Sequence, residues 1–541
     1  MSGYKQPHLR TLDRGLLIFC AVVLGGTVAY PCIRLLMEAF AQWQWDVIGQ
    51  GAGRSAMTNT LLMSLASVVA SGIVGTAIAI FVTRYTFPGR KALAVLAYLP
   101  FALPPLVGTL SFFYLIGTDG FIPRTVHQVL GYENFRINGP VAILLIHTYS
   151  FSVYFYAMVS AALEGMDVSQ GEAARTLGAS RLRTFWKVTV PYLTPALMGA
   201  SLLSFMTSAA SFSAPYFFGD DFPYLSVEIY NERSQFNNSG AMTLSVVLAV
   251  VSLLGVLLFR SRHTPGTSGT KGTPRAITSR SGKLFTGFLA WGCMGLLLLP
   301  HLNIVYLSFV NHREWYAELF PTAFTLDNYT ALFQDDASFS PIRNSVWMSL
   351  VAAASCLAVG LPAAYLIGRQ RRGGRWVNVL VMLPWALPGT VVAMNLITAF
   401  NDPALPVSLQ LYNTVYLLPL AYFVRFIPLL TRMATAAVTQ FDGTLIEAGQ
   451  TLGGSRRYCF QHIVMPLMAP SLLAATALVF ASCLGEFVAT ILLYTPANLP
   501  IGIQIYQEWR GSGTGAAFAY SVLLMLLVTM TLFFTSARKK D

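Results

Sequence analysis

The side chains of this chain that could do chemistry gather in two strongly apolar stretches. Hydroxyl and carboxyl groups recur there at the three- and four-residue spacing that places them on one face of a helix. Polar groups inside a membrane are costly, so they either line a transport path or hydrogen-bond between helices. We interpret them as two stripes of a translocation pathway, with bonding between helices as the alternative. The stripes are Ser204, Thr207, Ser208 and Ser211 in the first half, and Ser482, Glu486 and Thr490 in the second.

No catalytic constellation accompanies these stripes. The seven histidines have no H-x-x-x-H spacing, and the six cysteines are scattered without the spacing of metal ligands. The chain also has no G-x-x-x-x-G-K-[ST] phosphate loop, so it cannot bind ATP by that route. We therefore expect no catalytic residue, no metal site and no cofactor bound by this chain. Any ATP and magnesium would be held by partner subunits.

The composition is that of a polytopic membrane protein. Of the 541 residues, 55% are hydrophobic and only 11% are charged, too few for the surface of a soluble protein of this size. A span needs about 20 apolar residues, which predicts an all-α fold with about twelve spans. We expect the first span to be a retained helix, and prolines to break the third span of each half. The expected spans are 15–38, 57–83, 92–117, 141–163, 191–218, 241–259, 284–310, 345–368, 376–400, 414–437, 467–493 and 515–536.

The net charge of +12 reflects topology. Most of the 35 Lys and Arg residues fall on one side of the expected spans, which places both termini in the cytoplasm by the positive-inside rule. The basic balance therefore does not indicate a nucleic-acid partner. Arg425 falls inside the tenth span, where Glu486 is one candidate for its partner.

The two halves of the chain are related to each other. Asp167, Glu172, Gly178 and Pro191 recur as Asp442, Glu447, Gly453 and Pro466, all at an offset of 275 residues. Matches at a steady offset indicate an internal repeat, and six spans per half make the repeat parallel. We predict a first half at 1–260, a basic Gly/Ser/Thr/Pro-rich cytoplasmic linker at 261–283, and a second half at 284–541.

A polar patch between the fourth and fifth spans occurs in both halves, as "EAARTLGAS" from Glu172 and "EAGQTLGGS" from Glu447. Asp167 can cap a helix that ends at Gly178, and Ser180 can cap a second short helix. A helix of about ten residues is not stable alone, so each should dock on a partner or on the protein itself. Duplication favours a twofold partner, approached by small residues and by one leucine in each copy. The docking candidates are Glu172, Ala173, Ala174, Leu177, Gly178, Glu447, Ala448, Gly449, Leu452 and Gly453.

The doubled pattern resembles the signature of binding-protein-dependent ABC importer permeases. "EAARTLGASRLRTFWKVTVP" (172–191) fits it closely, and "EAGQTLGGSRRYCFQHIVMP" (447–466) has Gly449 in place of the second alanine. The resemblance implies the type I permease fold, a bacterial inner membrane location, and coupling loops at 167–183 and 442–458. It also implies two ABC ATPase subunits, expected to be a homodimer, and a periplasmic or surface-tethered solute-binding protein. This chain would be a transport subunit and not an enzyme.

Within that family the chain most resembles fused ferric-iron permeases. The residues that carry this likeness are "GEFVATILLYTPANLPIGIQIY" (485–506) and "YFVRFIPLLTRM" (422–433). Thiamine, polyamine and phosphonate permeases are similar enough to remain alternatives for the substrate. The symmetric segments "EIYNE" (228–232) and "QIYQE" (504–508) could receive the binding protein. A twelve-span secondary transporter is the alternative from another class, but it does not predict the doubled patch.

Overall fold

The computed structural model describes residues 7–49, 51–132, 135–259, 275–277, 279–315, 318–371, 373–511 and 513–537, and most of the predicted linker (261–274 and 278) lies outside them. Among the described residues, eleven helices are long and apolar enough to cross a membrane, and one bent helix pair is a twelfth candidate. This confirms the predicted all-α membrane fold. The chain divides into two compact units, unit 1 (Met1–Trp43 and Leu326–Asp541) and unit 2 (Gln44–Thr325).

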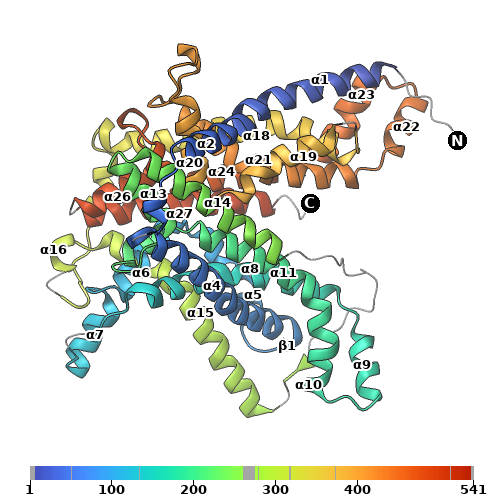
Figure 1. Ribbon diagram of the computed structural model, residues 1–541. Helices are drawn as coiled ribbons and strands as arrows, with labels where there is room; N and C mark the ends of the chain where they lie inside the picture. The colour runs from blue at the N-terminus through green and yellow to red at the C-terminus, as the bar shows by residue number, and fades with distance from the viewer. Residues whose placement is uncertain are drawn as a thin grey trace. The chain divides into compact units, whose positions relative to one another are not determined.

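Unit 2 contains the membrane helices α4 (Gly51–Arg84), α8 (Gly139–Gly165), α11 (Val190–Ala209), α14 (Asn238–Leu258) and α15 (Arg280–Phe309), and the candidate span Pro105–Leu130, which α6 and α7 form. Figure 1 shows α9 and α10 toward the same end of this unit as β1, and α7 at the other end. Its other elements are α3 (Trp45–Gly49), β1 (Tyr85–Thr86), α5 (Arg90–Leu96), η2 (Leu99–Ala102), α6 (Pro105–Ile116), α7 (Phe121–Leu130), α9 (Val168–Thr176), α10 (Arg181–Thr184), η3 (Phe185–Thr189), α12 (Ser213–Phe218), α13 (Leu225–Ser234), β2 (Arg275–Ala276) and α16 (His312–Trp315).

Unit 1 contains the membrane helices α1 (Pro7–Leu24) and α2 (Tyr30–Ala41), joined by the π-turn η1 (Gly25–Ala29), and α18 (Asp336–Gly368), α21 (Leu417–Gln440), α24 (Met465–Leu484) and α27 (Thr514–Ala537). In Figure 1, α22 and α23 lie at the end of this unit where α1 begins. Its other elements are α17 (Asp327–Thr330), η4 (Ala331–Phe333), α19 (Gly374–Met382), η5 (Leu383–Ala386), α20 (Gly389–Phe400), η6 (Val407–Leu409), α22 (Thr444–Thr451), α23 (Arg456–Cys459), η7 (Phe460–Val464), α25 (Thr490–Leu493), η8 (Pro496–Asn498) and α26 (Ile501–Arg510).

Helix starts follow the capping residues of the sequence. The side chains of Asn237, Ser279 and Asp335 accept hydrogen bonds from backbone N–H groups in the first turns of α14, α15 and α18, at 3.1, 3.1 and 2.7 Å. Each satisfies one of the donors that a helix start leaves without an intrahelical partner. Linker residues Arg275–Ala276 pair in parallel with Tyr85–Thr86 after the end of α4. The described end of the linker is therefore attached to unit 2.

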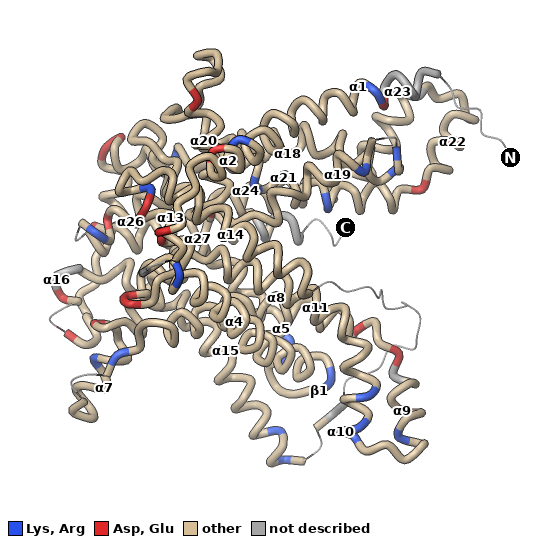
Figure 2. The backbone as a smooth tube through the Cα atoms, viewed as in Figure 1, with Lys and Arg blue, Asp and Glu red and all other residues tan. Residues whose placement is uncertain are grey.

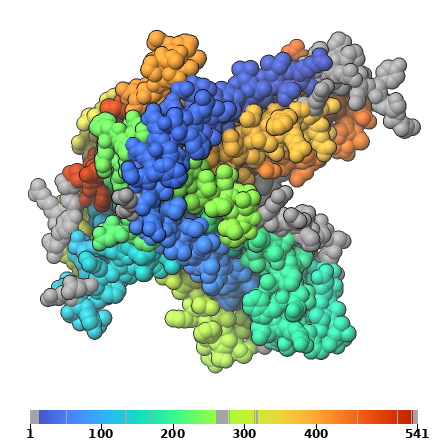
Figure 3. Space-filling model, in the orientation of Figure 1, coloured from blue at the N-terminus to red at the C-terminus, as the bar shows by residue number. Residues whose placement is uncertain are grey.

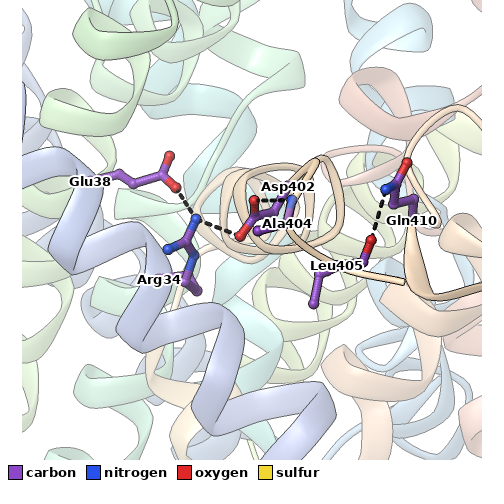
Figure 4. A network of polar contacts seen from close by, with 6 residues as sticks. All are labelled: Arg34, Glu38, Asp402, Ala404, Leu405 and Gln410. Atoms are coloured by element: carbon purple, nitrogen blue, oxygen red, sulfur yellow. Dashed lines mark hydrogen bonds and ion pairs between the residues drawn. The ribbon is translucent and has the colours of Figure 1, made fainter. Parts of the chain in front are cut away.

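The units of packing differ from the units of sequence repetition, because the first membrane segment of each half packs on the other half. The segment α1–α2 belongs to unit 1, where Asp13 pairs with Arg371 at 3.4 Å and the Asn395 amide contacts the Cys32 sulfur at 3.2 Å. Figure 4 shows the C-terminal part of α2, where Arg34 bridges Glu38 at 2.6 Å and Asp402 at 2.8 Å. Nothing in the hydropathy of 1–260 or 284–541 indicates this exchange.

The second exchanged helix, α15, is attached to unit 2 by buried polar contacts. The Ser111 hydroxyl of α6 donates to the Pro300 carbonyl at 2.7 Å, and the Asn303 amide donates to the Ser111 carbonyl at 2.9 Å. The Tyr149 hydroxyl of α8 donates to the Leu297 carbonyl at 2.9 Å. These bonds supplement the apolar contact of Ala290, Met294 and Leu297 with the core of unit 2.

We expect Asn303→Ala to destabilise the protein, because it removes the donor to the Ser111 carbonyl of a different helix. Losing one partner of a buried hydrogen bond costs about 1–3 kcal/mol, so the unfolding midpoint in detergent should fall. Leu302→Ala is the matched control, because that side chain is 59% exposed. Equal midpoints for the two variants would contradict this role of Asn303.

Both third spans are broken at corresponding prolines, as predicted. The span expected at 92–117 is interrupted at Leu103–Pro104, and the span expected at 376–400 at Leu387–Pro388. The leucine before each proline is extended, with ψ of 108° and 133°, because a proline disfavours the helical conformation of the preceding residue. In unit 1 the two helical pieces meet at an angle of 113°.

Candidate functional site: two repeated loops and a buried polar centre in each unit

The first loop folds as the sequence predicts. The Asp167 carboxylate accepts a hydrogen bond from the Ser169 N–H at 3.0 Å and caps α9. At the other end Gly178 has φ of +86°, a conformation that glycine adopts without strain. The Gly178 and Ala179 N–H groups donate to the carbonyls of Arg175 and Ala174, both at 3.0 Å. This pair of bonds is the Schellman motif, which ends the helix with satisfied carbonyls.

The second loop repeats this geometry at α22. Gly453 has φ of +88°, and the Gly453 and Gly454 N–H groups donate to the carbonyls of Gln450 and Gly449, both at 3.0 Å. The Asp442 carboxylate accepts from the Thr444 N–H at 2.9 Å, and this bond lowers the pKa of the Asp442 carboxyl below its usual value. Helix α9 starts at Val168, directly after its capping aspartate, whereas α22 starts at Thr444, two residues after Asp442. Helix α22 is therefore one residue shorter at its start. The two loops thus end in the same way and begin slightly differently.

Most of the docking candidates are exposed. Leu177 is 88% exposed and Leu452 is 89% exposed, although leucine side chains are usually buried in folded proteins. The same holds for Glu172, Ala173, Gly178, Glu447, Ala448 and Gly453, which are all exposed. Ala174 and Gly449 are only partly exposed. A Cβ atom on Gly449 would lie 2.7 Å from the Ile463 Cδ1 atom, so this position faces the loop's own second segment. Its part in the approach of a partner stays a prediction, and in this structure Gly449 packs against Ile463.

A second short segment connects each docking helix to the next membrane helix. Ser180 caps α10 by accepting from the Arg183 N–H, and Ser455 accepts in the same way from the Tyr458 N–H, both at 3.2 Å. These two caps confirm the sequence prediction. The segment then forms a π-turn in each half, η3 (Phe185–Thr189) and η7 (Phe460–Val464). The sequence-based prediction does not include these π-turns, although Pro191 and Pro466 indicate a disturbed helix there because proline lacks an N–H donor.

The surface around the first loop is basic and hollowed. In Figure 3 the α9–α10 segment is the lobe at the lower right. A shallow hollow in it is lined by Ala174, Leu177, Ala179, Arg183, Thr184, Lys187 and Val188. Figure 2 shows further Lys and Arg residues near β1 and at the start of α15, toward the same end of unit 2. An apolar hollow with a cationic rim suits a protein partner that presents apolar and acidic side chains.

The first polar stripe forms a hydrogen-bonded centre inside unit 2. His147 of α8 lies 2.9 Å from the Ser67 hydroxyl through Nδ1 and 2.9 Å from the Ser211 hydroxyl through Nε2. The Ser208 hydroxyl lies 3.2 Å from His147 Nδ1, and the hydroxyls of Ser204 and Ser71 are 3.1 Å apart. Bonding between helices is therefore what these serines do in this structure. Sequence reasoning gave no role to His147, the residue that joins them.

The second polar stripe forms a corresponding centre inside unit 1. The Arg425 guanidinium donates from Nε to Glu486 Oε2 at 2.9 Å, which confirms the suggested pair. The Ala489 N–H donates to Glu486 Oε1 at 2.9 Å, so both carboxylate oxygens are engaged. The Thr490 hydroxyl lies 2.9 Å from that of Tyr422.

The stripes do not continue along one helix. Helix α11 ends at Ala209 and α24 ends at Leu484, so Ser211, Glu486 and Thr490 lie beyond the helices to which we assigned them. The expected spans 191–218 and 467–493 therefore begin and end too late, because the candidate membrane helices are Arg181–Ala209 and Arg457–Leu484. The chain can turn here because side chains accept or donate at the freed backbone groups: the Tyr224 hydroxyl donates to the Ser208 carbonyl at 2.8 Å.

Thr207 and Ser482 differ from the other stripe residues. They occupy equivalent positions, and each hydroxyl donates at 2.7 Å to a carbonyl four residues earlier in its own helix, Leu203 or Leu478. Both side chains are half-buried. The Thr207 hydroxyl also lies 3.5 Å from that of Tyr154 in α8, a longer contact than the 2.7 Å bonds, so both residues are held mainly by their own helices.

The symmetric segments "EIYNE" and "QIYQE" lie on short helices, α13 and α26. Ile229 and Ile505 are fully buried and anchor these helices. Glu228 is half-buried beside Asn231, and burial raises the pKa of the Glu228 carboxyl. Glu508 accepts from the Gln504 amide at 2.8 Å. These segments are ordered helices and not solvated loops.

The fold and the repeated loops define the class of this protein as an all-α, multi-pass membrane protein with a glycine-ended, leucine-bearing helix in both halves. The family of inner membrane components of binding-protein-dependent transport systems matches residues 60–263 and 357–539. The chain belongs to this family and has the all-α fold of type I ABC importer permeases, with both permease units in one polypeptide. It is a multi-pass membrane transport component and not itself an enzyme. This membership excludes the secondary-transporter alternative.

Three curated relatives show where the chain lies within the family. It is 28% identical over 88% of its length to 86% of a probable ABC transporter permease protein, y4fN, of Sinorhizobium fredii. It is 27% identical over 96% of its length to 77% of the ferric transport system permease protein FbpB of Actinobacillus pleuropneumoniae. The sulfate transport system permease protein CysT of Salmonella typhimurium is 32% identical, but it matches only 46% of this chain and 89% of CysT.

Proposed function

We propose that this chain is the membrane subunit of an ATP-driven importer that passes ferric iron from a periplasmic binding protein to the cytoplasm. Two ABC ATPase subunits, a homodimer in this proposal, bind the loops 167–183 and 442–458. Both termini and the linker lie in the cytoplasm of a bacterial cell, on the side of these loops. ATP binding closes the ATPase pair, the loops move, and the membrane helices change from inward-facing to outward-facing.

The doubled docking helix supports this proposal most directly. Two helices 275 residues apart end in the same hydrogen-bonded turn and each presents one exposed leucine, Leu177 or Leu452. A large side chain that is exposed at equivalent places in two repeats is typical of a twofold protein interface. The basic residues near the first loop fit a cytoplasmic position.

Ferric iron is the best-supported cargo because the relatives that match nearly the whole chain include ferric permeases. The sulfate permeases match single halves. Thiamine, polyamine and phosphonate remain alternatives from the sequence resemblance. Glu486 is an oxygen ligand of the kind that ferric iron favours, but both of its oxygens are engaged. We therefore assign recognition of iron to the binding protein and propose Thr207 and Ser482 as the pathway residues.

Uptake by proteoliposomes tests the proposal. The chain would be reconstituted with an ABC ATPase and a ferric-binding protein from the same organism, and radioactive ferric iron would be measured inside the vesicles. We expect uptake only with ATP and with both partners present. Unlabelled ferric citrate should compete, whereas thiamine, spermidine, sulfate and a phosphonate should not. Uptake without an ATPase would refute an ATP-driven importer. Competition by one of the other solutes would identify that solute, and not ferric iron, as the cargo.

A further inference from the structure

The packing between each docking helix and its connecting segment differs between the two loops, because the second loop has smaller residues on the side of the docking helix and a longer one, Ile463, in the connecting segment. In the first loop Ala174 and Ala179 line the same hollow as Thr184 and Val188. The residues 275 positions later are Gly449, Gly454, Cys459 and Ile463. We call each set of four residues a joint. In the second joint two methyl groups are missing, at Gly449 in the docking helix and at Gly454 just after it, while the connecting segment gains one carbon atom at Ile463. At residue 459 one sulfur atom replaces the hydroxyl and methyl groups of Thr184.

The second joint is packed without spare room. A Cβ atom on Gly449 would lie 2.7 Å from Ile463 Cδ1 and 3.0 Å from the Cys459 sulfur. The Cδ1 atom is the one that isoleucine has and valine lacks, so the first joint can hold Ala174 beside Val188. Cys459 is 1% exposed and also lies against Gly454, whose Cβ atom would be 3.3 Å from the sulfur. Compensation of this kind indicates that contact across the joint is required, because packed interiors are sensitive to single methyl groups.

The joint connects the docking helix to a π-turn and not only to a loop. Ile463 lies in η7 and Val188 in η3, and each π-turn runs directly into a membrane helix, α24 or α11. The Met465 N–H donates to the Phe460 carbonyl, and the Val190 N–H to the Phe185 carbonyl. A movement of α22 therefore reaches α24 through a side-chain contact as well as along the backbone.

We propose that the two joints are positioning contacts that transmit movement of each docking helix to the membrane helix after it, with Ile463 and Val188 as the transmitting residues. This rests on the proposed function, because the ATPase subunits supply the movement. Ala174 and Gly449, the third residues of the Glu-Ala-Ala and Glu-Ala-Gly motifs, then serve this internal contact. Leu177 and Leu452 face the partner. A methyl group at residue 449 pushes the docking helix away from its π-turn, and a smaller residue 463 makes room for it.

The test uses the variants Gly449→Ala, Ile463→Val, the double variant, and Ile463→Ala, with Gln461→Ala as an exposed control in the same π-turn. All would be assembled with the ATPase and binding protein in proteoliposomes. Gly449→Ala and Ile463→Ala should each lower the solute transported per ATP hydrolysed by about five-fold or more, since overpacking and loosening both displace the helix. The double variant should recover to within about two-fold of the parent, a non-additive result expected only of residues in contact. Copurification of the ATPase should stay unchanged throughout.

A partner-free measurement separates this proposal from the proposed function. In the isolated chain, Gly449→Ala should speed maleimide labelling of Cys459, and adding Ile463→Val should slow it again. Parent-like transport per ATP and parent-like labelling in Gly449→Ala would overturn the joint. Loss of ATPase binding in Gly449→Ala that Ile463→Val does not restore would also overturn it, because residue 449 would then be a partner contact. If the labelling rates change as expected but the parent protein shows no ATP-driven transport, the joint is supported and the proposed importer function is refuted.

Discussion

Aspartate in place of both Leu177 and Leu452 will release the ATPase subunits and reduce ATP-driven uptake to background. These side chains are 88% and 89% exposed at the ends of α9 and α22, so their substitution disturbs no internal packing. Truncating one well-packed anchor residue of an interface costs about 2 kcal/mol or more. A buried unpaired carboxylate adds a further penalty. Two such sites together should abolish copurification of the ATPase.

The single variants and a control define this result. Leu177→Asp and Leu452→Asp alone should each weaken copurification, and uptake should fall by at least tenfold, the factor that about 1.4 kcal/mol gives. Val407→Asp is the control, because Val407 is 84% exposed in a different loop of unit 1 and should leave the ATPase bound. All variants should insert and elute as the parent does. Undiminished ATPase binding by the double variant would refute docking at these leucines.

The fold of the loops 167–183 and 442–458 was largely predictable because its signals are local. A capping aspartate, a glycine that allows positive φ and a later proline act within a few residues, and the structure confirms Asp167, Gly178 and Gly453 in those places. The inward-facing position of Gly449 could not be predicted in the same way. It depends on Cys459 and Ile463, which approach only because a π-turn changes the direction of the connecting segment.

The membrane helices were predictable as apolar lengths but not in their ends or partners. Hydropathy continues through Ser211 and Glu486, although the helices end at Ala209 and Leu484, because the residues of the following turn are themselves apolar. Hydropathy also carries no information about which bundle a helix joins. The packing of α1–α2 in unit 1 and of α15 in unit 2 depends on contacts such as Arg34 with Asp402 and Asn303 with Ser111.

Removal of the Glu486 carboxylate should destabilise unit 1 more than the loss of a single neutral hydrogen bond does. Arg425 would lose its partner, and the Ala489 N–H would lose its acceptor. The guanidinium also lies against the first residue of α20, where a Cβ atom on Gly389 would be 2.9 Å from Arg425 Nη1. The pair thus joins α21 to two places where helices are interrupted. Breaking a buried ion pair by removing one partner costs about 3–5 kcal/mol, so Glu486→Ala should sharply lower the unfolding midpoint in detergent.

The double variant Arg425→Met/Glu486→Ala distinguishes the ion pair from simple loss of packing. Once both charges are gone, no uncompensated charge stays buried, and replacing a buried pair by neutral residues is often close to neutral. We therefore expect the double variant to unfold at a higher temperature than Glu486→Ala, although it has one more substitution. Ser482→Ala is the neighbouring control, because its hydroxyl bonds only to the Leu478 carbonyl of its own helix. If the destabilisation of the double variant equalled the sum for Arg425→Met and Glu486→Ala alone, the two side chains would act independently. That result would contradict the 2.9 Å contact between them.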